Sequence, residues 1–257
     1  MLALLLACAL ISGEEESVPV VEEAPPTAAD WNAWPPDNQL VPSAEELAVA
    51  LGEAGLHARV TELAARISHD TDIVLSSLAA MRTGAEIGAL LLEAGAAPPE
   101  VRSARLGRIA EGFEVMELDT AGVMALRDAG KELEGEAWLE RLDGERPALG
   151  GLTGQRGDGE LPLALAGGWL QALWLVARAA EIEQRPESAH GLLYRPEVDA
   201  YFMEYLSKCA AERFPDGTIT ALDEGMTTIR ERAANDPMSA DDVRVVRETA
   251  EGLLGMM

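Results

Sequence analysis

Apolar residues recur at every third or fourth position through most of the chain beyond residue 43. Clear examples are Leu56, Val60, Leu63 and Ile67; Leu106, Ile109, Phe113 and Met116; Ile219, Leu222, Met226 and Ile229; and Val243, Val246, Ala250 and Leu253. This spacing places apolar side chains on one face of an α-helix. No comparable stretch alternates with period two, so the pattern predicts an all-α fold.

Residues that interrupt helices divide this pattern into segments. The breaks fall at Gly55, residues 69–72, Pro98-Pro99, near Asp119, Arg185-Pro186, residues 215–217 and Asp236-Pro237. Ser43 followed by Glu46 has the form of a capping box and is predicted to begin the first helix. We therefore expect one helical domain over residues 43–257, built as a multi-helix bundle of eight or nine helices.

A glycine-rich stretch, residues 143–160, interrupts the predicted bundle and is expected to be a flexible loop or a domain boundary. A phosphate-binding loop would need a Gly-Lys-Ser/Thr sequence after a strand, and this stretch has neither. The sequence gives it no catalytic role.

Two segments are unusually apolar. Leu161–Ala177 carries no charged residue but is shorter than the roughly 20 residues that span a bilayer, so it predicts a central core helix and no transmembrane helix in the body. Residues 73–92 contain only two charged residues, Arg82 and Glu86, which share one helix face. In the same segment, Gly84 and Gly88 allow a close approach of another helix.

A ligand pocket between these two helices is one hypothesis, because buried polar groups often serve a ligand. Its candidate residues are Arg82, Glu86, Trp169, Trp174 and Arg178. The other interpretation is structural. The Arg82 and Glu86 pair would brace helices, and the two tryptophan rings would pack in the core.

Composition excludes several classes of function. Asp and Glu number 45 against 20 Lys and Arg, for a formal charge of -25, which repels nucleic acid phosphates. The three histidines are scattered and no paired Cys-x-x-Cys occurs, so we expect no metal and no cofactor. No nucleophile motif is present, so the sequence shows no centre for nucleophilic catalysis.

The first twelve residues are uncharged and apolar, and they include Leu5-Leu6-Ala7-Cys8. This tetrapeptide resembles the lipobox of bacterial lipoproteins. The resemblance implies cleavage before Cys8, acylation of Cys8, and a membrane anchor; Ala9, rather than Asp, after the cysteine implies the outer membrane. A signal peptide needs a basic region and a longer apolar stretch than seven residues, so we expect the coding sequence to begin further upstream. A plain secretory signal and a chance apolar start are the alternatives.

Residues 13–42 are rich in Glu, Pro, Ala and Val, a composition that cannot bury enough apolar surface to fold alone. We expect a disordered tether that holds the body about 30 Å from the anchor. A tether directly after an acylated cysteine is a coherent arrangement.

The sequence thus favours a lipoprotein of the cell envelope, facing the periplasm or the cell surface, with a helical scaffold or interaction domain and envelope proteins as partners. A helical ligand-binding module is the second hypothesis. An enzyme that uses dispersed carboxylates is the third.

Overall fold

The computed structural model describes residues 42, 44–67, 76–93, 95–145, 149, 160–207 and 211–257. Within these residues the protein is helical and contains no strand, which confirms the all-α prediction. The α-helices are α2 (Ala44–Ala54), α3 (His57–Arg66), α4 (Ser76–Leu92), α5 (Pro99–Val115), α6 (Ala121–Glu132), α7 (Gly135–Gly144), α9 (Glu160–Glu183), α10 (His190–Leu193), α11 (Pro196–Tyr205), α12 (Thr218–Ala233) and α13 (Ala240–Leu254). Two 3-10 turns, η2 (Pro186–Ala189) and η4 (Ala211–Arg213), precede α10 and α12.

The expected count of eight or nine helices is wrong, since the described residues form eleven. Two predicted helices are each divided. Gly135, with a φ of 54°, is the first residue of α7, shortly after α6 ends at Glu132, and Pro196 is the first residue of α11, shortly after α10 ends at Leu193. A positive φ and a proline both end a regular helix, so each break has a local cause.

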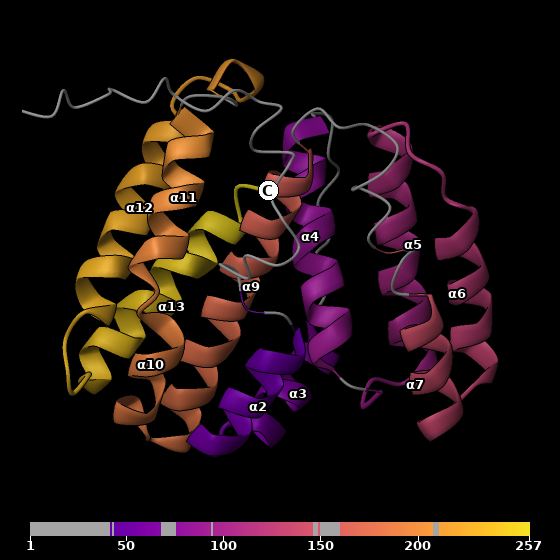
Figure 1. Ribbon diagram of the computed structural model, residues 1–257, viewed down its shortest axis with the longest axis horizontal. Coiled ribbons are helices and arrows are strands. Elements are labelled where there is room, and N and C mark those ends of the chain that lie inside the picture. The colour runs from indigo at the N-terminus through magenta and orange to yellow at the C-terminus, as the bar shows by residue number, and fades with distance from the viewer. Residues whose placement is uncertain are drawn as a thin grey trace, which may run out of the picture.

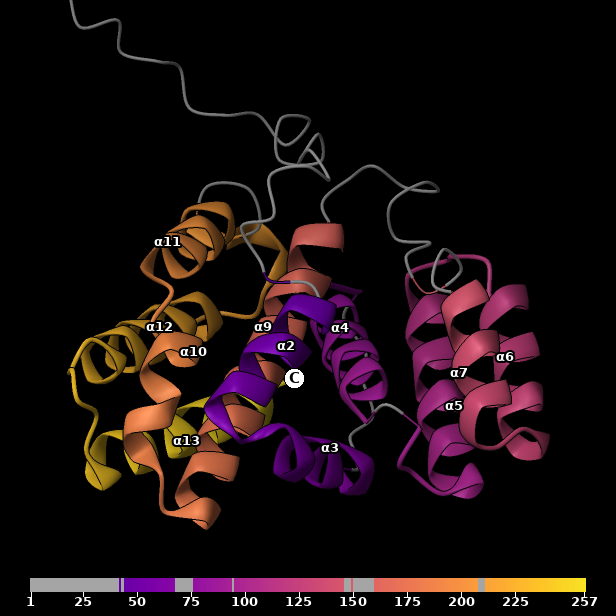
Figure 2. The same ribbon diagram turned by 60° about the horizontal axis from the view of Figure 1, so that its bottom comes forward.

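The helices lie side by side around α9, as Figures 1 and 2 show. On one side α9 packs against α4, which packs against α5, and α5 packs against α6. On the other side α9 packs against α13, which packs against α12. Helices α2 and α3 cross one end of the α4 and α9 pair. The predicted apolar stripes supply the core, because Leu56, Ile109, Ile229 and Val246 are all fully buried.

Helices α4 and α9 are in unusually close contact. A Cβ atom added to Gly84 would lie 1.8 Å from the carbonyl oxygen of Ala164, and one added to Gly167 would lie 1.7 Å from that of Met81. Neither position therefore admits a larger residue without movement of backbone. The close approach expected at Gly84 is confirmed.

The apolar segment predicted as a core helix forms α9. By length and composition α9 is the one helix in the described residues that could cross a membrane, but 78% of its most apolar 18-residue window is buried inside the protein. Burial against other helices on this scale is typical of a core helix.

Several expectations fall on residues outside those that the structure describes. They are the lipobox and Cys8, the tether, the capping residue Ser43, and most of the glycine-rich stretch. A capping box is present at the start of α13, where the Ser239 hydroxyl accepts from the Asp242 amide at 3.1 Å and the Asp242 carboxylate accepts from the Ser239 amide at 3.0 Å.

Candidate functional site

Four charged side chains meet in the interior where α3, α4 and α5 converge. We call them the buried charge cluster: Glu86 on α4, Glu93 just after α4, and Arg105 and Arg108 on α5. Glu86, Glu93 and Arg105 are at most 1% exposed, and Arg108 is 15% exposed. Burying a charged side chain costs free energy unless the charge is paired. The partners of each side chain therefore decide whether the cluster has a structural or a chemical role.

Arg105 is the centre of the buried charge cluster. Its Nε donates to Glu86 Oε2 at 3.1 Å, and its Nη1 donates to Glu93. Its Nη2 donates to the carbonyl oxygens of Ala64 at 2.7 Å and Ile67 at 3.0 Å, at the C-terminal end of α3. One guanidinium therefore joins three helices.

Glu86 accepts hydrogen bonds from two arginines of α5. Arg108 Nε donates to Glu86 Oε1 at 2.6 Å, while Oε2 accepts from Arg105. Both carboxylate oxygens thus face guanidinium groups of α5. Arg82, one turn earlier on α4, is half-buried.

Glu93 is a buried carboxylate that is only partly paired. Burial raises the pKa of Glu93 to about 7, although the charges of Arg105 and Arg102 act to lower it. Its Oε1 is buried and has no hydrogen-bond partner in the described part of the chain. Arg102 lies 4.7 Å above the ring of Trp138 and donates to the Leu133 carbonyl at 3.1 Å, and burial lowers its pKa.

The tryptophan candidates lie elsewhere on α9. Trp169 is buried, and its Nε1 donates to the Asp199 carboxylate of α11 at 3.2 Å. Burial raises the pKa of Asp199 to about 6, against the hydrogen bond from Trp169, which lowers it. Trp174 is half-buried, with its Nε1 enclosed and unpartnered among the described residues.

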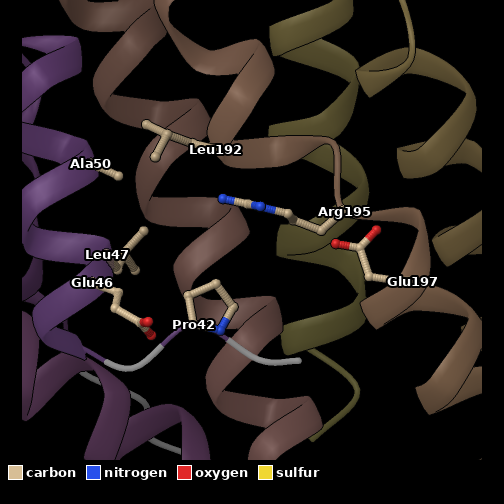
Figure 3. Close-up of a pocket in the computed structure, with 7 residues that line it drawn as sticks. All are labelled: Pro42, Glu46, Leu47, Ala50, Leu192, Arg195 and Glu197. Atoms are coloured by element: carbon tan, nitrogen blue, oxygen red, sulfur yellow. The ribbon is translucent and has the colours of Figure 1, made fainter. Parts of the chain in front are cut away.

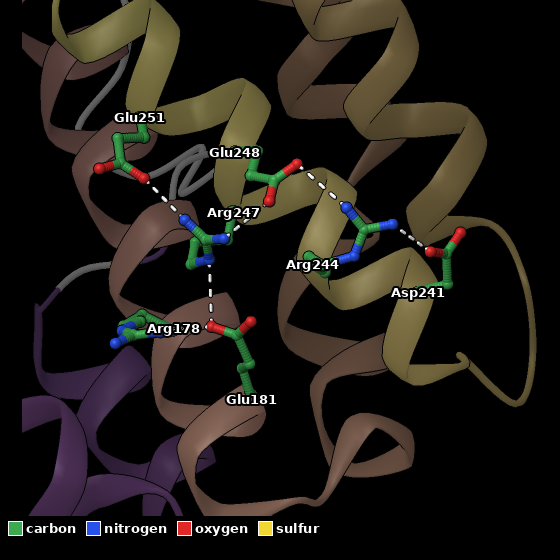
Figure 4. Close-up of polar contacts among 7 residues, drawn as sticks. All are labelled: Arg178, Glu181, Asp241, Arg244, Arg247, Glu248 and Glu251. Carbon is green, nitrogen blue, oxygen red and sulfur yellow. Dashed lines mark hydrogen bonds and ion pairs between the residues drawn. The ribbon is translucent and has the colours of Figure 1, made fainter.

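Arg178 belongs to a surface network rather than to the interior (Figure 4). It donates to Glu181 at 2.5 Å, and Glu181 also pairs with Arg247 of α13 at 3.1 Å. Further pairs along α13 join Arg244, Arg247, Glu248 and Glu251. The structure thus places Glu86, Trp169 and Arg178 among three different sets of partners. Their joint role in ligand binding stays a prediction.

Sequence reasoning missed Arg105, Arg108, Glu93 and Asp199. A signal for Arg105 was present, since it lies one residue before Leu106 and four before Ile109 and so borders the apolar stripe of α5. A charged residue beside a core stripe calls for a buried partner.

The described residues contain no group of three or more His, Cys, Asp or Glu side chains placed to hold a metal ion. No protein-family model, curated protein or solved structure matches the chain.

Proposed function

We propose that this chain is a lipid-anchored protein of the bacterial cell envelope whose helical body serves as a scaffold or interaction domain. The observation that carries the proposal is Leu5-Leu6-Ala7-Cys8, followed after four residues by the acidic, proline-rich residues 13–42 and then by a folded body. An acylated cysteine at the head of such a segment anchors the body at a distance from the membrane.

The chemistry of the body supports a structural role. In the buried charge cluster, Arg105 and Arg108 turn their donors to the Glu86 carboxylate, and Arg105 also bonds the last carbonyls of α3. A catalytic carboxylate or arginine needs space for a reacting group within hydrogen-bond reach. These groups instead hold α3, α4 and α5 together.

The charge of the chain supports one class of partner. A formal charge of -25 favours a basic protein surface over phosphate-bearing polymers. Ala9 after Cys8 favours the outer membrane, with the body facing the periplasm or the outside. We expect complexes with envelope proteins to weaken as salt increases, because exposed charges are screened.

Metabolic labelling with an alkyne fatty acid tests the anchor. The epitope-tagged chain would be expressed from its own locus as wild type, Cys8→Ala and Cys209→Ala. The two cysteines are the only ones in the sequence, so Cys209→Ala is a matched control. Label in the wild type and in Cys209→Ala, and none in Cys8→Ala, is the expected result. Equal labelling of Cys8→Ala would show that the anchor is not at that residue.

Crosslinking in intact cells then tests the interaction role. Captured envelope proteins should be recovered with the wild type at low salt and lost with Cys8→Ala, which would no longer be held at the membrane. Recovery of the same proteins with both forms would show that the anchor does not direct the interaction.

A further inference from the structure

A cavity of about 220 Å³ lies between α2 and the segment that joins α10 to α11 (Figure 3). Glu46, Leu47 and Ala50 line it from α2, and Leu192, Arg195 and Glu197 line it from the opposite side, with Pro42 at one end. An engineered cavity of about 150 Å³ in another protein holds a benzene molecule. This cavity therefore has room for a molecule of about nine non-hydrogen atoms.

Arg195 is the distinctive group of the cavity. It directly precedes Pro196, the first residue of α11, and Figure 3 shows its side chain extended across the cavity toward α2. Its Nε is buried without a hydrogen-bond partner, and among the described residues its guanidinium forms no ion pair. Arginines elsewhere, such as Arg59 and Arg247, pair with carboxylates. In a chain with more than twice as many acidic as basic residues, an arginine that has no partner among the described residues and lies along a cavity indicates an anionic group of a ligand.

The rest of the lining defines the remainder of that ligand. Glu197 brings a negative charge to the cavity beside the positive charge of Arg195, which disfavours a simple anion and favours a molecule that also carries a cation. Leu47, Ala50 and Leu192 supply an apolar wall. The charges and the apolar wall of the cavity together fit a small zwitterion with an aliphatic side chain.

We propose that this cavity binds a free aliphatic α-amino acid of the size of leucine. The planar guanidinium of Arg195 takes the ligand carboxylate through two parallel N–H bonds. The ligand ammonium group faces the carboxylate of Glu197, and the ligand side chain packs on Leu47 and Leu192. This site is separate from the buried charge cluster and does not depend on the membrane anchor.

Calorimetric titration of the full chain tests the proposal with three probes. They are L-leucine; 4-methylpentanoate, which keeps all six carbons but lacks the ammonium group; and 3-methylbutylamine, which lacks the carboxylate together with its carbon. Saturable binding of leucine, at least tenfold tighter than either fragment, is expected. No saturable binding of leucine, or a fragment that binds as tightly as leucine, overturns the proposal.

Variants assign the binding to this cavity. Arg195→Gln should weaken leucine binding at least tenfold, whereas Arg244→Gln, which removes a surface arginine of α13 that pairs with Asp241 and Glu248, should leave it unchanged. Ala50→Met fills the cavity from α2 without loss of charge and should also abolish binding. This second variant keeps the test decisive if Arg195→Gln does not fold. Wild-type affinity in a folded Arg195→Gln or Ala50→Met protein excludes the cavity as the site.

Discussion

Replacement of Gly84 by alanine tests whether the contact between α4 and α9 holds the fold together. The new Cβ would lie 1.8 Å from the Ala164 carbonyl oxygen, a distance that real Cβ contacts do not reach. Relief to 3.0 Å requires the two helices to separate by about 1.2 Å, because the opposing atom belongs to backbone and cannot rotate away. Overpacking of this kind costs about 3 kcal/mol at its upper range.

The substitution also brings a gain, since alanine favours a helix over glycine by up to about 1 kcal/mol. The net expectation is that the free energy of unfolding falls by about 2 kcal/mol. For a chain of this size that corresponds to a Tm lower by about 4 to 8 °C. Gly107→Ala is the matched control, because Gly107 lies within α5 and an added Cβ there meets nothing within 4 Å. It should stabilise the protein by about 0.5 to 1 kcal/mol.

Urea unfolding followed by circular dichroism measures both variants and the coupling to Gly167. A Cβ at Gly167 would meet the Met81 carbonyl oxygen at 1.7 Å, so the same separation of helices relieves both contacts. The double variant Gly84→Ala with Gly167→Ala should therefore cost much less than the sum of the single changes. If Gly84→Ala is as stable as Gly107→Ala, the close contact between α4 and α9 does not exist.

Two further predictions concern buried charge, both measured by urea unfolding. Burial raises the pKa of Asp199 to about 6, so this group stabilises the fold fully below its unfolded pKa near 3.8, and that contribution is lost as pH rises through 6. The free energy of unfolding of Asp199→Asn should equal that of the wild type near pH 4 and exceed it by about 2 to 3 kcal/mol at pH 8. The control Asp223→Asn, which changes an exposed carboxylate, should not show this difference. Equal stability of Asp199→Asn and the wild type at pH 8 would contradict the prediction. Arg105→Met leaves Glu86 and Glu93 buried without their shared partner and should cost about 3 to 5 kcal/mol at pH 8. A loss below about 1 kcal/mol would show that the cluster does not brace the helices.

The fold class was predictable because helical periodicity survives wherever one face of a helix is buried. The apolar series on α5 and α13 are buried as expected, and α9 occupies the centre. The two extra helix breaks escaped prediction for a different reason. Gly135 and Pro196 interrupt segments whose apolar residues continue on either side. The helices before and after each break both bury apolar side chains, so the spacing of apolar residues alone does not reveal the break.

The contacts of the site residues could not be predicted, since they depend on tertiary approach. Arg105 is 19 residues from Glu86 and 38 from Ile67, yet one guanidinium contacts both. Arg195 faces α2, a helix roughly 150 residues earlier in the chain. Nothing in the local sequence of either arginine encodes these distances.

The use of arginine connects the interior to the surface. The chain has only 20 basic residues, and several of them, Arg102, Arg105 and Arg108 among them, are largely removed from solvent. Because these arginines lie in the interior, they do not neutralise carboxylates on the surface. Self-repulsion among those carboxylates opposes compaction. Interior ion pairs that tie α3, α4 and α5 together counteract that repulsion.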